Sequence, residues 1–236
     1  MSFVFKNLGK NLVTDRLGGF SKPPYDSFNL GFHTGDDAEN VAKNRAKLAA
    51  DFGREKIVFM NQIHSDLVVK IDEFPIKTPE CDALITDRAR VALAVMTADC
   101  APILFYDPAR GAIGAAHAGW RGTRSFIAAK TALAMRENYG VNFADLRVGI
   151  APAICGKCYE IGEEVAAKWR ELPSYLQAAL NENHLDLQLA NRLILREIGV
   201  LDENIETIAE CTLENPALFS HRRANPSGRF VSLISL

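Results

Sequence analysis

Long apolar stretches are scarce in this chain of 236 residues. The longest uninterrupted apolar run covers residues 91–96, which suits a strand, whereas a membrane-spanning helix needs about 20 apolar residues. We therefore expect no membrane partner. Residues 1–11 lack a basic leader followed by an apolar block, so we also expect no secretory signal.

An excess of one charge and a disulfide-type cysteine pattern are also missing. The chain has 27 basic and 29 acidic residues, for a net charge of -2. This balance gives no general attraction to nucleic acid, so we expect no nucleic-acid partner. The five cysteines are an odd number and are not spaced like a small disulfide scaffold. We therefore expect a reducing, cytoplasmic location.

What the chain does contain is the composition of a globular protein. Apolar residues make up 48% of it, which is enough to bury a large core. Strand-like and helix-like segments alternate without a repeat or a linker, so we expect one α/β domain spanning residues 1–236. The Gly-, Pro-, Ser- and Asn-rich residues 16–37 predict a long ordered loop, which is often functional.

The local patterns predict individual elements. Helices are expected over residues 38–52 and 121–139, with a mostly helical stretch over 162–200 that breaks near Pro173. Residues 107–111 have turn composition, which predicts a hairpin between the strands on either side. The β-rich runs predict strands over 57–60, 67–71, 83–86, 91–96, 103–106, 112–116, 146–150, 205–209 and 230–234.

Three polar positions stand at the ends of predicted strands. His64 follows one β-rich run, Asp99 and Cys100 interrupt two others, and His117 ends a strand of small residues. Taken singly, each has an ordinary interpretation: His64 as a solvated histidine, Cys100 as a buried apolar thiol, and the segment at His117 as a tight turn. Pro102 cannot continue a hydrogen-bonded ladder, so the Asp99–Cys100 break is expected where a sheet opens to a cleft.

Taken together, His64, Cys100 and His117 are candidates for a catalytic zinc site. Three protein ligands with one open position are typical of catalytic zinc, whereas structural sites usually have four. Thiolate and imidazole also suit copper. The wide spacing matches no short zinc-finger pattern and does not by itself decide the matter.

Other segments suggest anion binding or metal binding. Arg121 stands at a predicted helix N-terminus, which suits a phosphate or carboxylate. Arg222 belongs to a basic C-terminal cluster at residues 220–223, together with Arg229, that either is solvated or holds an anion. Cys155 and Cys158 form a CxxC pair, but without a second pair we expect neither redox activity nor a structural metal there.

Several motifs together resemble the laccase-domain family, first described as multicopper-polyphenol-oxidase-like and now as purine nucleoside phosphorylases. The resemblance covers nearly the whole chain. Its two most specific segments are Thr97-Ala98-Asp99-Cys100 and His117-Ala118-Gly119-Trp120-Arg121-Gly122. The others are RLGG (16–19), NLG (29–31), GDD (35–37), NR (44–45), QIH (62–64), CDAL (81–84), YE (159–160), CT (211–212), RR (222–223) and GR (228–229).

The resemblance implies layered mixed β-sheets flanked by helices and a zinc ion held by His64, Cys100 and His117. It also implies phosphorolysis of adenosine and inosine, cleavage of methylthioadenosine, and deamination of adenosine. Ser65 stands where the family usually has Gly, and Ala101 where it usually has Leu, and either difference could reshape the pocket.

Each implied reaction requires particular groups. Deamination needs a zinc-activated water and a carboxylate that carries protons, for which Asp99 is the candidate. Phosphorolysis needs an anion held beside the ribose C1′ as the glycosidic bond breaks. Arg45, Arg121 and Arg222 are the candidates that would hold phosphate and substrate.

Two alternatives remain open. A copper-dependent phenol oxidase would need more imidazoles than the chain's five histidines provide, although adventitious copper at the same site could give weak oxidation. A hydrolase with Cys100 as nucleophile would use a Cys–His pair built from the same residues. The sequence does not specify an oligomeric state.

Overall fold

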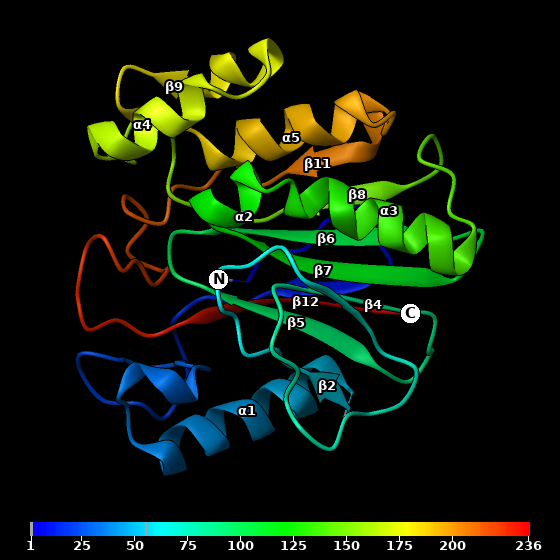
Figure 1. Cartoon of the computed structure of the whole chain (residues 1–236). Coiled ribbons are helices and arrows are strands. Elements are labelled where there is room, and N and C mark those ends of the chain that lie inside the picture. Colours follow the sequence, from blue (N-terminus) through cyan, green and yellow to red (C-terminus); the bar gives the residue numbers. More distant parts are fainter. Residues whose placement is uncertain (1, 55) are drawn as a thin grey trace.

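Four layers build the structure, a computed structural model that describes residues 2–54 and 56–236 (Figure 1). Two β-sheets pack face to face in the middle. Helix α1 (Ala38–Phe52) covers the outer face of one sheet. Helices α2 (Trp120–Arg124), α3 (Ile127–Tyr139), α4 (Glu163–Arg170) and α5 (Leu187–Glu197) lie over the other sheet.

The sheet beneath α1 has four strands, in the order β1-β12-β5-β2. Strand β12 (Phe230–Ser235) pairs antiparallel with both β1 (Lys10–Val13) and β5 (Ala92–Thr97). The short strand β2 (Ile57–Val58) runs parallel to β5 at the edge.

The second sheet has six strands, in the order β11-β8-β6-β7-β4-β3. Its centre is the antiparallel hairpin of β6 and β7, in which Asp107 pairs with Ala112. The strands are β3 (Val68–Lys70), β4 (Ala83–Thr86), β6 (Ala101–Asp107), β7 (Ala112–Ala118), β8 (Arg147–Ile150) and β11 (Ile205–Thr207). The connections β2–β3 and β5–β6 both carry the chain from the four-stranded sheet to the six-stranded one.

Short elements complete the fold. Strands β9 (Leu180–Asn181) and β10 (His184–Leu185) form a small hairpin beside α4. The 3-10 turns are η1 (Phe32–Thr34), η2 (Ser174–Ala179) and η3 (Asp202–Asn204). Within the described residues, no helix has the length and apolar character needed to cross a bilayer.

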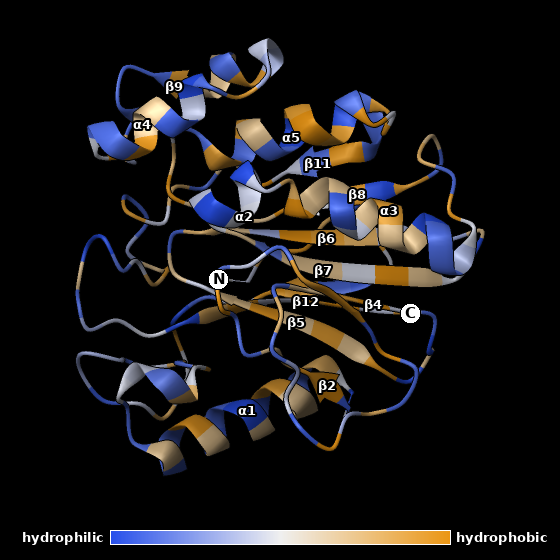
Figure 2. Ribbon diagram, viewed as in Figure 1, coloured by the Kyte–Doolittle hydropathy of each residue, from blue (hydrophilic) through white to orange (hydrophobic). Residues whose placement is uncertain are grey.

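The two-residue period of the strands divides the core between the layers. On β6, Ile103 and Phe105 pack against the helices, whereas Leu104 packs between the sheets. On β5, Val95 faces the other sheet and Met96 faces the α1 layer. Because both sheets are covered on both faces, their strands are apolar nearly throughout, as Figure 2 shows.

Most predicted elements are confirmed. Helix 38–52 and strand 83–86 have the expected bounds, and the other predicted strands agree within two residues. The Asp37 side chain accepts the Glu39 N–H at the start of α1, and Gly53 ends the helix at φ 65°. The predicted loop 16–37 contains only the turn η1.

Two predictions are corrected, and two elements were not predicted. The single helix over 121–139 is wrong, because Phe126 at φ 62° separates α2 from α3. Pro102 does not stop its strand: it is the second residue of β6, and its carbonyl accepts the Ala151 N–H at 2.9 Å. The stretch 162–200 is mostly helical and breaks near Pro173, as predicted, but it also contains the hairpin β9–β10, which was not predicted. Strand β1 was not predicted either.

Candidate metal centre

His64, Cys100 and His117 meet at one end of the two sheets. Their possible ligand atoms lie within 4.8 Å of one another, and the two imidazole rings are 4.9 Å apart in an edge-to-face arrangement. His117 is on β7, and Cys100 immediately precedes the neighbouring strand β6. His64 comes from the β2–β3 connection, so the predicted clustering of the three residues is confirmed.

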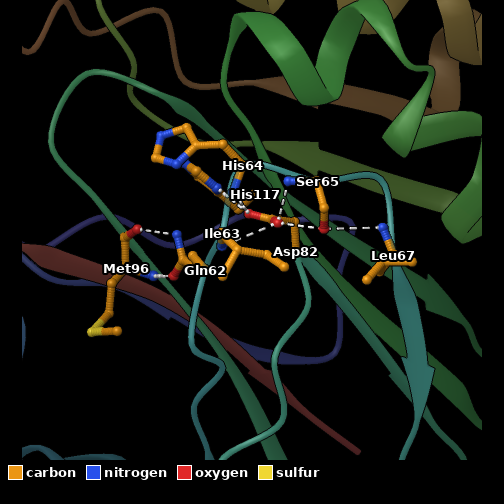
Figure 3. Close-up of polar contacts among 8 residues, drawn as sticks. All are labelled: Gln62, Ile63, His64, Ser65, Leu67, Asp82, Met96 and His117. Atoms are coloured by element: carbon orange, nitrogen blue, oxygen red, sulfur yellow. Dashed lines mark hydrogen bonds and ion pairs between the residues drawn. The ribbon is translucent and has the colours of Figure 1, made fainter.

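The buried carboxylate of Asp82 organises two of these three residues (Figure 3). Its Oδ1 accepts the His64 N–H at 3.1 Å and contacts His117 Nδ1 at 2.7 Å. Its Oδ2 accepts the Ile63 and Ser65 N–H groups at 3.2 and 2.5 Å and the Ser65 hydroxyl at 2.7 Å. These bonds hold His64 at φ 58°, an unusual conformation for histidine.

Asp82 also fixes the tautomer of His117. With Nδ1–H donating to Asp82, the Nε2 lone pair is left for a metal ion. A tetrahedral zinc site with Zn–S and Zn–N distances near 2.0–2.3 Å has donor atoms about 3.3–3.8 Å apart. A spread of 4.8 Å or less therefore requires only small side-chain adjustments.

Without a metal, Cys100 and His117 behave as an ion pair. Burial raises the pKa of Cys100, but the His117 charge and hydrogen bonds from both histidines outweigh it and bring the pKa to about 6. Burial lowers the pKa of His117, but the Cys100 charge and the bond to Asp82 raise it to about 9. For Asp82, burial raises the pKa, but hydrogen bonds from His117 and Ser65 bring it below its usual value.

Gly119 and Gln62 allow the chain to fit around this centre. A Cβ on Gly119 would lie 3.0 Å from Cys100 Sγ and 3.3 Å from His64 Cδ2, so only glycine leaves the centre undisturbed. Gln62 donates to the Met96 carbonyl at 2.8 Å and accepts the Met96 N–H at 2.9 Å. The His64 segment is thereby fastened to the end of β5.

The three residues open into a cavity of about 510 Å³. Its lining combines basic side chains with Met96 and Tyr159. The complete lining is His33, Met60, Asn61, Gln62, His64, Met96, Thr97, Ala98, Asp99, Cys100, His117, Tyr159, His221, Arg222 and Arg229. The volume suits a small organic molecule.

Asp99 lines the cavity in a left-handed conformation at φ 98°. Its carboxylate accepts the Thr212 hydroxyl at 2.6 Å and the Arg222 N–H at 2.7 Å. Its carbonyl accepts the Ile154 N–H at 2.9 Å. The carboxylate therefore holds the 212 and 222 segments against the cavity, directly beside Cys100.

The three arginines predicted to bind substrate lie in different places. Arg222 lines the cavity and lies 5.2 Å from the centroid of the Tyr159 ring. Arg45 does not line it, because its guanidinium lies between the rings of Phe32 and Phe59, at 4.4 and 3.8 Å. Arg121 lies over Trp120 at 4.3 Å and is also absent from the lining.

Sequence reasoning missed the roles of several residues. Asp82 was part of a recognised motif, but nothing in the sequence indicated that it lies under the His64 turn and beside His117. His33 and Tyr159 reach the cavity from distant loops. Arg229, noted within a basic cluster, also lines the cavity, and burial lowers its pKa although Cys100 and Asp99 oppose that shift.

Comparison with known proteins places the chain in a family. The family model described as "multi-copper polyphenol oxidoreductase laccase" matches residues 10–236. The chain belongs to this family.

Curated relatives of the chain carry a different name. The purine nucleoside phosphorylase Rv2149c of Mycobacterium tuberculosis is 41% identical over 234 residues, covering 95% of this chain and 91% of that protein. The purine nucleoside phosphorylase YlmD of Bacillus subtilis is 35% identical over 241 residues, covering 94% and 87%.

Solved structures share the fold over nearly the whole chain. YlmD from Geobacillus stearothermophilus superposes with a TM-score of 0.91 at 34% identity, covering 98% of this chain and 93% of that one. The Neisseria meningitidis protein NMB0706 gives 0.90 at 36% identity, covering 100% and 98%. The predicted layered α/β fold is confirmed.

Proposed function

We propose that this chain is a zinc-dependent purine nucleoside phosphorylase that acts on adenosine, inosine and methylthioadenosine. The observation that carries the proposal is the convergence of His64, Cys100 and His117 at a cavity whose lining also includes Arg222 and Arg229. The names of the curated relatives support the reaction class. We further propose that the chain is one domain; the cytoplasmic location stays a prediction.

The donor set of the centre fits zinc. Two imidazoles and one thiolate would hold a zinc ion with three protein ligands, the number that catalytic zinc sites usually have. Asp82 supplies the carboxylate partner that zinc-binding histidines usually have. A zinc ion bound there supplies Lewis-acid activation to a group in the open position.

The basic residues of the cavity lining are the candidates for binding phosphate. Arg222 and Arg229 line the cavity together with His33 and His221, and guanidinium groups suit phosphate oxygens. We therefore assign phosphate binding to Arg222 and Arg229. Arg45 and Arg121, also predicted for this role, do not line the cavity. They would affect phosphate binding only through the residues that they contact.

Other residues of the cavity lining suit a nucleoside. Tyr159 and Met96 offer apolar surface to a purine. Thr97 also lines the cavity, and within the described residues its buried hydroxyl has no hydrogen-bond partner.

Deamination of adenosine is a second activity that we assign to the same centre. It requires a group that moves a proton beside the reacting purine. Asp99 lines the cavity next to Cys100, and its carboxylate already accepts hydrogen bonds from Thr212 and Arg222. Exchange of a proton by Asp99 would therefore require one of these bonds to open.

Copper oxidation of phenols is the alternative suggested by the family description. Two histidines and one cysteine can also form a blue-copper site, which usually has a weak axial methionine. Met96 lines the cavity, but its sulfur lies 3.5 Å from Arg45 Nη2, which donates to it. That contact favours zinc over an axial Met–copper arrangement.

The test is to incubate the purified chain with inosine or adenosine, with and without phosphate, and to separate the products. Phosphate-dependent formation of hypoxanthine or adenine together with ribose 1-phosphate is expected. Formation of inosine from adenosine would report deamination. Oxidation of a phenol by copper-loaded chain, without base release from any nucleoside, would contradict the proposal.

A further inference from the structure

A second group of metal-ligating side chains lies outside the first centre. Cys155, Cys158, Cys211 and Glu214 place their donor atoms within 4.8 Å of one another. The CxxC pair was expected to lack partners, because the sequence has no second pair. The fold supplies them from a segment 56 residues further along the chain.

The backbone positions these thiols. The N–H groups of Cys158 and Tyr159 both donate to the Cys155 carbonyl, at 2.9 and 3.0 Å, which makes a tight turn. A parallel bridge joins Ala153 to Cys211. The Cys155 N–H also donates to Cys211 Sγ at 3.3 Å. All three thiols are therefore held near one point by main-chain contacts.

The surroundings favour a cation. A cleft of about 720 Å³ reaches the group from the surface and is lined by Cys155, Cys211 and Glu214. Glu182 and Asp186 line the same cleft, together with Lys157 and His184. Glu214 is exposed and Cys211 is buried, so the donors surround a point at the edge of the protein.

We propose that Cys155, Cys158, Cys211 and Glu214 form a second, structural zinc site. Three thiolates and one carboxylate give the four donors that a closed zinc site requires, and thiolates select zinc over hard cations. Tetrahedral donors around zinc are about 3.8 Å apart when they are thiolates. On binding, each thiol forms a bond to zinc and releases its proton to solvent.

The position of this site connects it to the first centre. Ile154, next to Cys155, donates its N–H to the Asp99 carbonyl at 2.9 Å. Thr212, next to Cys211, donates its hydroxyl to the Asp99 carboxylate at 2.6 Å. A zinc ion bound between the two segments would therefore fix both supports of Asp99.

Cobalt reconstitution tests the site without reference to activity. In a Cys100→Ser background, the first centre has lost its thiolate, and the remaining Cys81 is fully buried. Thiolate-to-cobalt absorption is therefore assigned to the second group. We expect strong absorption in this background and its loss when Cys158→Ser is added. We also expect zinc analysis of the wild-type chain to give two equivalents, and Cys100→Ser to keep one.

Glu214→Gln provides a test at an exposed position that does not threaten folding. It should keep the thiolate-to-cobalt absorption in the Cys100→Ser background but weaken cobalt binding roughly tenfold. Glu210→Gln, in the same loop and outside the group, is the matched control and should bind as the background does. The proposal is overturned if the Cys100→Ser chain, purified with reductant and folded by circular dichroism, shows no thiolate-to-cobalt absorption. It is equally overturned if Glu214→Gln and Glu210→Gln bind cobalt alike.

Discussion

Replacing Asp82 by asparagine should separate the metal centre from the fold. The change keeps the shape of the side chain but replaces one oxygen by an NH₂ group. The Oδ2 side faces three donors from Ile63 and Ser65, so the amide oxygen should stay there. The NH₂ group then points at His117 and at the His64 N–H.

Two consequences of Asp82→Asn have different sizes. His117 can accept from the new NH₂ group only by moving its proton to Nε2, which removes the lone pair needed for zinc. Loss of such a carboxylate partner typically weakens metal binding about 10–100-fold. The His64 N–H also loses its acceptor, which should destabilise the fold by about 1–3 kcal/mol.

The assay for Asp82→Asn is competition for zinc with a chromophoric chelator, together with thermal unfolding of the metal-free chain. Asp107→Asn is the matched control, because Asp107 is also buried and its Oδ1 accepts the Ala109 and Arg110 N–H groups at the other end of β6. The control should keep zinc affinity. Unchanged zinc affinity in Asp82→Asn, or an equal loss in Asp107→Asn, would refute this account of His117.

Three further predictions address the site. Gly119→Ala should weaken zinc binding in the same competition assay, because the new Cβ would lie 3.0 Å from Cys100 Sγ. Gly162→Ala is the control and should bind zinc normally, because the atom nearest to its new Cβ is 3.8 Å away. Arg222→Met should raise the KM for phosphate about 10–100-fold, because charge-assisted hydrogen bonds are lost. Arg121→Met, outside the cavity, should change this KM little. Steady-state kinetics with both variants checks the assignment. In the metal-free chain, ionised Cys100 stabilises the fold most above its ordinary pKa of 9.0, and this contribution is lost as pH falls through about 6. Charged His117 contributes fully below 6.5, and this contribution is lost as pH rises through about 9. The gain at Cys100 and the loss at His117 offset each other between about pH 6.5 and 9, so urea unfolding should show nearly constant stability across that range. A steep change of stability within it would contradict the ion pair.

Local signals explain which elements could be predicted. Asp37 and Gly53 mark both ends of α1, and turn composition marks the β6–β7 hairpin. Nothing local marks the break at Phe126, because phenylalanine rarely adopts the left-handed conformation that it has there. The hairpin β9–β10 is too short to show a two-residue period.

The site also combines residues that local sequence signals predict with contacts that no local signal marks. His64, Cys100 and His117 were found because they end strands and match family motifs, and their meeting is confirmed. The contacts of Asp82, and the meeting of Cys211 with the CxxC pair, depend on segments far apart in the sequence. Arg45 is absent from the cavity lining, and its guanidinium instead contacts two aromatic rings that no motif contains.

Metal dependence of nucleoside cleavage tests the central claim most directly. The purified chain is stripped with a chelator, and ribose 1-phosphate formation from inosine and phosphate is measured before stripping, after it, and after addition of zinc or copper. We predict that stripping abolishes formation and that zinc restores it, with Cys100→Ser inactive throughout. Full activity in the stripped chain would indicate a Cys100 nucleophile, and restoration by copper alone would equally contradict the account.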